Sequence, residues 1–299
     1  MHRPAGPLVS FPAIVFLSAA CVSAAQRPAA AVFDGARAFQ HVRQMVAIGP
    51  RPAGSPGAQK TRDYIRQQLT VIGLPIEEQA FDAATPLGPV RMVNVRAFLG
   101  DRHARRLIIA SHYDTKLFKN LRFVGANDGG SSTGFLLELA RVLKQQPPAM
   151  PIEFLFVDGE EALVEWQGDD NTYGSRHYVQ TAVKDGTLKQ MGALILVDMI
   201  GDADLRLKRE SASTPWLTDI IWARARALER PQFVDESTPI LDDHVPFLEA
   251  GVPAVDLIDL EYPHWHEASD TLDKVSAESL QVVGDVLVAA IPDVIARVR

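Results

Sequence analysis

The stretch Phe154-Leu155-Phe156-Val157-Asp158-Gly159-Glu160-Glu161 joins an apolar run to a pair of acidic residues. Four apolar residues in succession, two of them phenylalanine, predict a strand that is buried on both faces of a parallel sheet. Gly159 interrupts the run and leaves Glu160 and Glu161 at the carboxyl end of the strand, where open α/β sheets bind their ligands. Neighbouring side chains on an extended chain point in different directions, so one glutamate can bind a metal ion while the other transfers protons. A solvated acidic turn is the simpler interpretation of an isolated Glu-Glu pair.

The rest of the chain alternates between apolar runs and helical patterns. Strands are predicted at 76–81, 90–98, 107–110, 193–197 and 254–258. Helices are predicted over 36–48, 56–73, 129–143, 176–183, 216–228, 244–250 and 277–298, and Pro292 is expected to kink the last of them. This alternation predicts an α/β fold, a three-layer sandwich with a mixed, mostly parallel central sheet flanked by helices.

Length and composition are those of a globular protein with one large domain. The chain has 299 residues, of which 47% are hydrophobic and 22% charged. The formal net charge of −7 argues against a nucleic-acid-binding surface, which needs clustered lysine and arginine. We therefore expect no nucleic-acid partner, and we expect a monomer.

The N-terminus has the layout of a secretory signal peptide. His2 and Arg3 precede an apolar run over 8–22, and small residues follow at 23–25. The run is short for a membrane span. We expect a signal peptide over 1–25, an exported enzyme in the periplasm or outside the cell, and a single zinc-dependent catalytic domain over 26–299. An uncleaved membrane anchor and a lipid-modified Cys21 are the alternatives.

Acidic residues and histidines gather where the predicted strands end. Because Cys21 is the only cysteine, a metal ion would be held by His, Asp and Glu alone. Such a ligand set is typical of a catalytic zinc with an open coordination position. Taken singly, an Asp after a strand is often a helix N-cap and a loop His is often solvated. The residues concerned are His112, Asp114, Asn127, Asp128, Glu160, Glu161, Asp198, His264, His266 and Asp270.

The same residues carry a resemblance that extends from about residue 36 to the C-terminus. The motifs are His112-Tyr113-Asp114-Thr115-Lys116, Phe123-Val124-Gly125-Ala126-Asn127-Asp128, Asp158-Gly159-Glu160-Glu161-Ala162 with Trp166, Tyr173-Gly174-Ser175-Arg176-His177, Asp242-Asp243-His244-Val245-Pro246-Phe247-Leu248 and Trp265-His266. In this order they resemble the zinc aminopeptidases of the bacterial leucyl-aminopeptidase kind. They resemble more closely the animal-type, zinc-dependent glutaminyl-peptide cyclotransferases.

The resemblance implies a role for each matching position. Asp128, Glu161 and His266 would bind one zinc ion, and Glu160 would be the general acid and base. Asp198 and Asp242 would form a carboxylate network near it, although an aminopeptidase would use Asp198 with His112 for a second metal. Trp166 and Trp265 would wall the substrate pocket. Loop packing of Trp166 and shielding of the metal by Trp265 are the plain alternatives.

The implied activity is conversion of N-terminal glutamine of peptides or proteins to pyroglutamate with release of ammonia, with one zinc ion. An aminopeptidase with two zinc ions is the alternative, and a non-catalytic metal-containing module that binds peptides or sugars is a third. Two departures from the cyclotransferase pattern bear on this choice. The sequence Gly130-Ser131-Ser132-Thr133-Gly134 is more like an aminopeptidase, and His112 and Asp114 are both present, so a second metal site stays open. The segment 261–264 is also shorter than in the animal enzymes, which affects the shape of the pocket.

Overall fold

The structure, a computed structural model, describes residues 1–2, 4–6 and 32–298. Residues 32–298 belong to one compact unit. The cleavage zone of the predicted signal peptide and Cys21 lie outside the described residues.

A six-stranded sheet forms the centre of this unit. Its strands lie in the order β1-β2-β4-β3-β5-β8. The pairs β3/β4, β3/β5 and β5/β8 are parallel, whereas β1/β2 and β2/β4 are antiparallel. The predicted mixed, mostly parallel sheet is therefore confirmed. The strands are β1 Ile76–Thr85, β2 Gly88–Leu99, β3 Arg106–His112, β4 Ile152–Val157, β5 Met191–Asp198 and β8 Ala254–Ile258.

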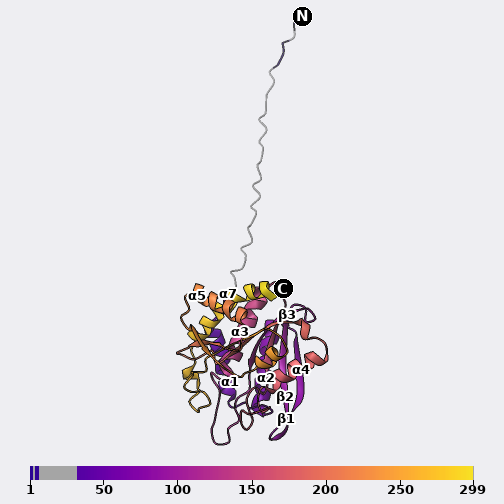
Figure 1. The fold of residues 1–299 in the computed structure, drawn as a ribbon. Helices are drawn as coiled ribbons and strands as arrows, with labels where there is room; N and C mark the ends of the chain where they lie inside the picture. The colour runs from indigo at the N-terminus through magenta and orange to yellow at the C-terminus, as the bar shows by residue number, and fades with distance from the viewer. Residues whose placement is uncertain (3, 7–31, 299) are drawn as a thin grey trace. The chain divides into compact units, whose positions relative to one another are not determined.

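Helices cover both faces of the sheet (Figure 1). The helices are α1 Gly35–Ile48, α2 Pro56–Ile72, α3 Gly130–Gln145, α4 Tyr173–Lys184, α5 Pro215–Ala227, α6 Val245–Glu249 and α7 Ala277–Val298. Side chains alternate along β4: Phe154 and Phe156 join the core under α1, α3 and α7, whereas Leu155 and Val157 join the core under α4 and α6. This alternation produces the three layers of the predicted sandwich.

A second, two-stranded parallel sheet was not expected from the sequence. It pairs β6, Leu207–Glu210, with β7, Phe233–Thr238. Both strands are mostly polar, and charged pairs such as Arg209–Asp235, 2.9 Å apart, lie on their exposed side. Short polar strands of this kind carry almost no apolar periodicity, so the pattern that predicts a buried strand is missing.

Helix α7 is the most apolar helix of the fold. It is long and apolar enough to cross a membrane by length and composition. However, 61% of its most apolar 18-residue window is buried within the protein, where it packs against α1 and α5. This burial is typical of a core helix. The helix continues across Pro292, and the kink expected there stays a prediction.

The sheet places the carboxyl ends of β3, β4, β5 and β8 at one edge, because these strands run parallel to one another. At the end of β4 the chain turns at Gly159, whose φ of +71° lies in the left-handed region. A Cβ atom at this position would also lie only 2.4 Å from Sδ of Met92. Glycine is therefore needed here, and the turn presents Glu160 and Glu161 at the edge of the sheet.

Candidate active site

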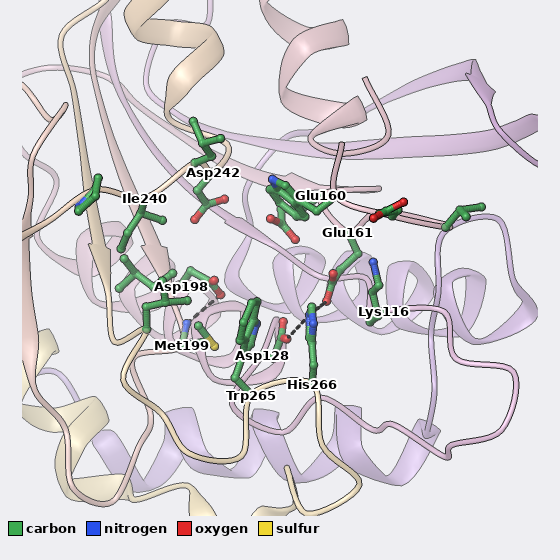
Figure 2. A pocket seen from close by; sticks show the side chains of 17 residues that line it. Lys116, Asp128, Glu160, Glu161, Asp198, Met199, Ile240, Asp242, Trp265 and His266 are labelled. Atoms are coloured by element: carbon green, nitrogen blue, oxygen red, sulfur yellow. Dashed lines mark hydrogen bonds and ion pairs between the residues drawn. The ribbon is translucent and has the colours of Figure 1, made fainter. Parts of the chain in front are cut away.

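A pocket of about 470 Å³ lies at this edge of the sheet. Figure 2 shows side chains from the ends of different strands and from separate loops pointing into it. The structure thus brings together eight of the nine residues predicted for the site. Those that line the pocket are Asp128, Glu160, Glu161, Trp166, Asp198, Asp242, Trp265 and His266. The ninth, His112, is buried at the end of β3 and contacts three of their carboxylates.

One group of three side chains has the geometry of a metal site. The Nε2 atom of His266 lies 3.0 Å from Oε1 of Glu161 and 3.5 Å from Oδ2 of Asp128. A tetrahedral zinc ion with bonds of about 2.0–2.1 Å keeps its ligand atoms roughly 3.3 Å apart. The observed separations match that spacing, so these residues can hold a metal ion.

Two buried carboxylate oxygens in this group have no hydrogen-bond partner among the described residues. They are Oδ2 of Asp128 and Oε2 of Glu161. Burial, followed by repulsion from other carboxylates such as Asp114, raises the pKa of Glu161 to about 8. Buried oxygens of this kind require a proton or a cation, and a divalent ion at this point would satisfy both.

The histidine of this group is suited to ligation. Burial lowers the pKa of His266 below its usual value, and Lys116 acts in the same direction against the opposing effect of Asp128. The imidazole is therefore neutral at pH 7, which is the form that binds metals. Its backbone has a φ of +57°, an uncommon value for a residue other than glycine. Trp265 stacks on its ring with the centroids 4.3 Å apart.

A second group, His112, Asp128 and Asp198, also brings three ligand atoms close together. Nε2 of His112 lies 3.0 Å from Oδ1 of Asp198 and 3.4 Å from Oδ1 of Asp128. The two groups share Asp128, as two metals bridged by one carboxylate would require. The described residues therefore offer ligands for one metal ion or for two, the two possibilities that the sequence left open.

Glu160 lines the same pocket as the first group but is not one of its three members. Its carboxylate is 3.8 Å from Nδ1 of His112. Burial raises the pKa of Glu160 well above its usual range; His112 opposes this, and Asp242 adds to it by charge repulsion. Asp242, from the loop before α6, has its own pKa raised to about 6 by burial and by Asp198. A carboxyl group with a raised pKa can both accept and return a proton near neutrality.

Three supporting residues fix the backbone of the site. The carboxylate of Asp114 accepts from the backbone N–H groups of Glu160 and Glu161, at 3.1 and 3.4 Å. The carboxylate of Asp270 accepts from the backbone N–H groups of Asn127 and Asp128, at 2.8 and 3.2 Å. The sequence analysis named Asp114 and Asp270 as acidic residues at strand ends, but it did not predict these hydrogen bonds.

The third supporting residue, Arg51, was missed. Its guanidinium is fully buried and donates to the carbonyls of Tyr113, Val124, Gly125 and Asp128, all on the loops that carry the site. The only signal for it in the sequence is an arginine within a Pro/Gly loop.

The remaining pocket lining is mostly apolar. Besides the two tryptophans it includes Val164, Met199, Pro239, Ile240, Leu241, Ile258 and Leu260. None of these residues was predicted, because an aliphatic residue in a loop gives no signal of a pocket. Met199 stands directly after Asp198 with a φ of +43°, so backbone strain lies at two points of the site.

Comparison with known proteins agrees with this geometry. Residues 94–291 match peptidase family M28. A glutaminyl-peptide cyclotransferase-like protein of Mus musculus is 34% identical over 257 residues, which cover 74% of this chain and 66% of the mouse protein. A glutaminyl-peptide cyclotransferase of Bothrops jararaca is 32% identical over 281 residues, which cover 80% of this chain and 76% of the snake protein.

A solved structure extends the likeness to the whole fold. The crystal structure of an Acidobacteriales bacterium glutaminyl cyclase superposes with a TM-score of 0.86 at 38% identity, covering 92% of this chain and 99% of that one. The resemblance inferred from the motifs is therefore confirmed. The chain belongs to peptidase family M28 and, within it, to the glutaminyl-peptide cyclotransferases.

Proposed function

We propose that the protein is a zinc-dependent glutaminyl-peptide cyclotransferase that converts the N-terminal glutamine of peptides or proteins to pyroglutamate and releases ammonia. The observation that carries this proposal is Glu160, a buried carboxyl group beside a three-ligand metal group in a tryptophan-lined pocket. The named relatives support the same activity.

Asp128, Glu161 and His266 are the residues that would hold the zinc ion. When bound, the ion supplies a Lewis acid that polarises the side-chain amide of the substrate glutamine. Three protein ligands would leave a zinc ion free to bind one further ligand, and all three line the pocket.

Glu160 moves the proton in this proposal. It accepts a proton from the substrate's α-ammonium group, and the freed nitrogen attacks the side-chain amide carbon. A new C–N bond closes the ring, the bond to the amide nitrogen breaks, and Glu160 returns the proton to that nitrogen as it leaves as ammonia. The attacking nitrogen loses its second proton to the departing ammonia, so the products are the lactam and ammonium. The negative charge of Asp242 near Glu160 favours the protonated form of Glu160, and Asp198 in turn raises the pKa of Asp242.

Trp166 and Trp265 complete the site as walls of the pocket. Ring closure needs no water nucleophile, and the apolar lining reduces competition from water at the amide carbon. Between these walls, the substrate glutamine would be held with its α-amine near its side-chain amide carbon. This placement lowers the entropic part of the barrier to ring closure.

An aminopeptidase is the second candidate, and the group His112, Asp128 and Asp198 favours it. There Glu160 would take a proton from water instead of from the α-ammonium, and an N-terminal residue would be released. The same side chains serve both reactions, so the distinction must come from the products.

Two peptides that differ only in their first residue, glutamine or leucine, test the proposal. Purified protein loaded with zinc should remove ammonia from the Gln-initiated peptide and leave the Leu-initiated peptide unchanged, as read by mass spectrometry. Release of a free N-terminal residue from either peptide would assign the protein to the aminopeptidases. Zinc content per chain is a companion measurement, with one tightly bound ion expected.

The sequence supports export to the periplasm or the cell exterior, because the first 25 residues have the layout of a signal peptide. Exported peptides and protein N-termini would then be the substrates. We propose that the exported protein is a monomer.

A further inference from the structure

The pocket wall next to the metal group is a short segment without regular secondary structure. It comprises residues 162–166 and follows Glu161 directly. Val164, Glu165 and Trp166 from this segment line the pocket. Leu163 is buried in a small apolar cluster, but Val164 is 56% exposed, so the part of the segment that lines the pocket has little apolar burial of its own. Specific polar contacts hold the same segment.

The carboxylate of Asp170 supplies most of these contacts. Its Oδ1 accepts from Leu163 N–H at 3.0 Å and from the Tyr173 hydroxyl at 2.6 Å. Its Oδ2 accepts from the N–H groups of Val164 and Glu165, both at 2.9 Å. Three successive backbone amides and one hydroxyl therefore converge on one side chain, which is only 6% exposed.

The environment of Asp170 keeps it ionised. Burial acts to raise its pKa, but the hydrogen bonds from the Tyr173 hydroxyl and the backbone amides outweigh burial and lower the pKa below its usual value. Hydrogen bonds to a charged acceptor are stronger than neutral ones. One further contact holds the segment at its other end, where Lys116 Nζ donates to the carbonyl of Ala162 at 2.6 Å.

We infer that Asp170 is a positioning residue that holds the wall segment 162–166 and so places Trp166 against the substrate glutamine. The inference rests on the proposed function. None of the hydrogen bonds of the Asp170 carboxylate involves Asp128, Glu160, Glu161 or His266. Asp170 therefore acts on substrate binding through the wall, whereas the metal and the proton-transfer group keep their own supports.

Asp170→Asn tests this inference, because the amide replaces one acceptor oxygen with an NH₂ group that faces hydrogen-bond donors in either orientation. Asp169→Asn is the matched control: it makes the same change of charge one residue away, at a side chain that is 95% exposed and pairs with Arg176. For a Gln-initiated peptide, Asp170→Asn should raise KM about tenfold, the value of one aromatic contact, with kcat close to that of the parent protein. Asp169→Asn should leave both constants unchanged.

Hydrogen exchange followed by mass spectrometry gives a readout that does not depend on activity. The amides of residues 163–165 should exchange faster in Asp170→Asn than in Asp169→Asn. Tyr173→Phe removes only one of the four donors and should move KM and exchange in the same direction by less, which keeps the test decisive if Asp170→Asn does not fold.

The outcomes separate the two proposals. If the parent protein cyclises the peptide but Asp170→Asn and Tyr173→Phe keep its KM, or lower kcat alone, the positioning inference is wrong and the proposed function stands. If the zinc-loaded parent protein does not cyclise the peptide, the proposed function fails and takes the inference with it.

Discussion

Glu160 and Glu161 are neighbours in the chain with different surroundings in the structure. Glu161 lies 3.0 Å from the imidazole of His266 and has an unpartnered buried oxygen. Glu160 instead lies toward His112 and Asp242, which dominate the charge effects on its pKa after burial. The turn at Gly159 thus leads into two glutamates with different neighbours, as the proposed division between metal binding and proton transfer requires.

Glu160→Gln tests this division at the level of one residue. The amide keeps the size of the side chain but cannot accept and return a proton, so we expect turnover to fall by about 10²-fold to 10⁴-fold. Zinc content should equal that of the parent protein. Glu161→Gln is the matched comparison, and there zinc should be lost together with activity. If Glu160→Gln keeps the turnover of the parent protein, Glu160 is not the proton-transfer group.

Asp128 depends on the loop that carries it, residues 123–128, which lies between β3 and α3. Arg51 binds the carbonyl side of this loop through Val124, Gly125 and Asp128. Asp270 binds its amide side and also accepts from the Tyr262 hydroxyl at 2.7 Å. The metal group thus takes its geometry from elements far away in the sequence.

Asp270→Asn should weaken zinc binding, because the amide cannot accept from both loop N–H groups and from Tyr262. Loss of such a support typically costs about 10-fold to 100-fold in metal affinity. Competition with a zinc chelator of known affinity measures the change. Asp273→Asn, at an exposed acid in the same region, is the control and should bind zinc like the parent protein. Equal affinities for all three proteins would contradict the role of Asp270.

The packing of α1 on α2 includes a half-buried titratable group, His41. Nδ1 of His41 lies 2.6 Å from the Tyr64 hydroxyl. Burial, with a smaller contribution from Arg37, lowers the pKa of His41 to about 4. Between pH 6.5 and about 4 the unfolded chain binds a proton at this position that the folded chain does not.

Acidification through that window should therefore destabilise the fold by up to about 1.4 kcal/mol per pH unit through His41 alone. In His41→Gln, whose side chain can still hydrogen-bond Tyr64, the free energy of unfolding should fall less steeply between pH 6.5 and 4. Urea unfolding at several pH values measures the slope. His103→Gln, in an exposed turn, should keep the parent slope. An unchanged slope in His41→Gln would show that His41 protonates freely in the folded protein.

At the scale of the whole molecule, we expect metal binding at the proposed site to increase stability. The site lies between β3, β4, β5 and the loops before α3, before α6 and after β8. A ligand that binds here therefore contacts several elements at the carboxyl edge of the sheet and stabilises their arrangement. Removing zinc would leave buried oxygens of Asp128 and Glu161 without a cation.

Chelation should consequently lower the melting temperature of the protein. Zinc at 100 times its Kd stabilises the folded state by about 2.7 kcal/mol. For a domain of this size that corresponds to a rise in Tm of roughly 5–10 °C. Differential scanning fluorimetry with and without chelator measures the shift, and Asp128→Asn should not respond to zinc. A parent protein with the same Tm in both conditions would contradict a zinc site at these residues.

Much of the fold could be predicted from local sequence, because buried strands and amphipathic helices have short apolar periods. The run over 154–157 predicted β4, and the similar runs at 107–110 and 193–197 predicted β3 and β5. The polar strands β6 and β7 could not be found, since their pairing depends on a partner outside the local sequence. Ordered motifs also predicted which residues share the pocket, because acids and histidines at strand ends carry a chemical signal.

The sequence alone determined the layered α/β fold, the family resemblance and the side chains that meet at the carboxyl edge of the sheet. Only the tertiary structure decided how these side chains are held. Arg51 and Asp270 act through backbone carbonyls and amides of distant loops, and Asp170 acts through amides of its own loop. Every residue type presents a carbonyl and every type except proline presents an amide N–H, so the sequence gives no signal for these contacts. Apolar periodicity and motif chemistry are properties of neighbouring residues, whereas hydrogen bonds to a distant backbone exist only once the chain has folded.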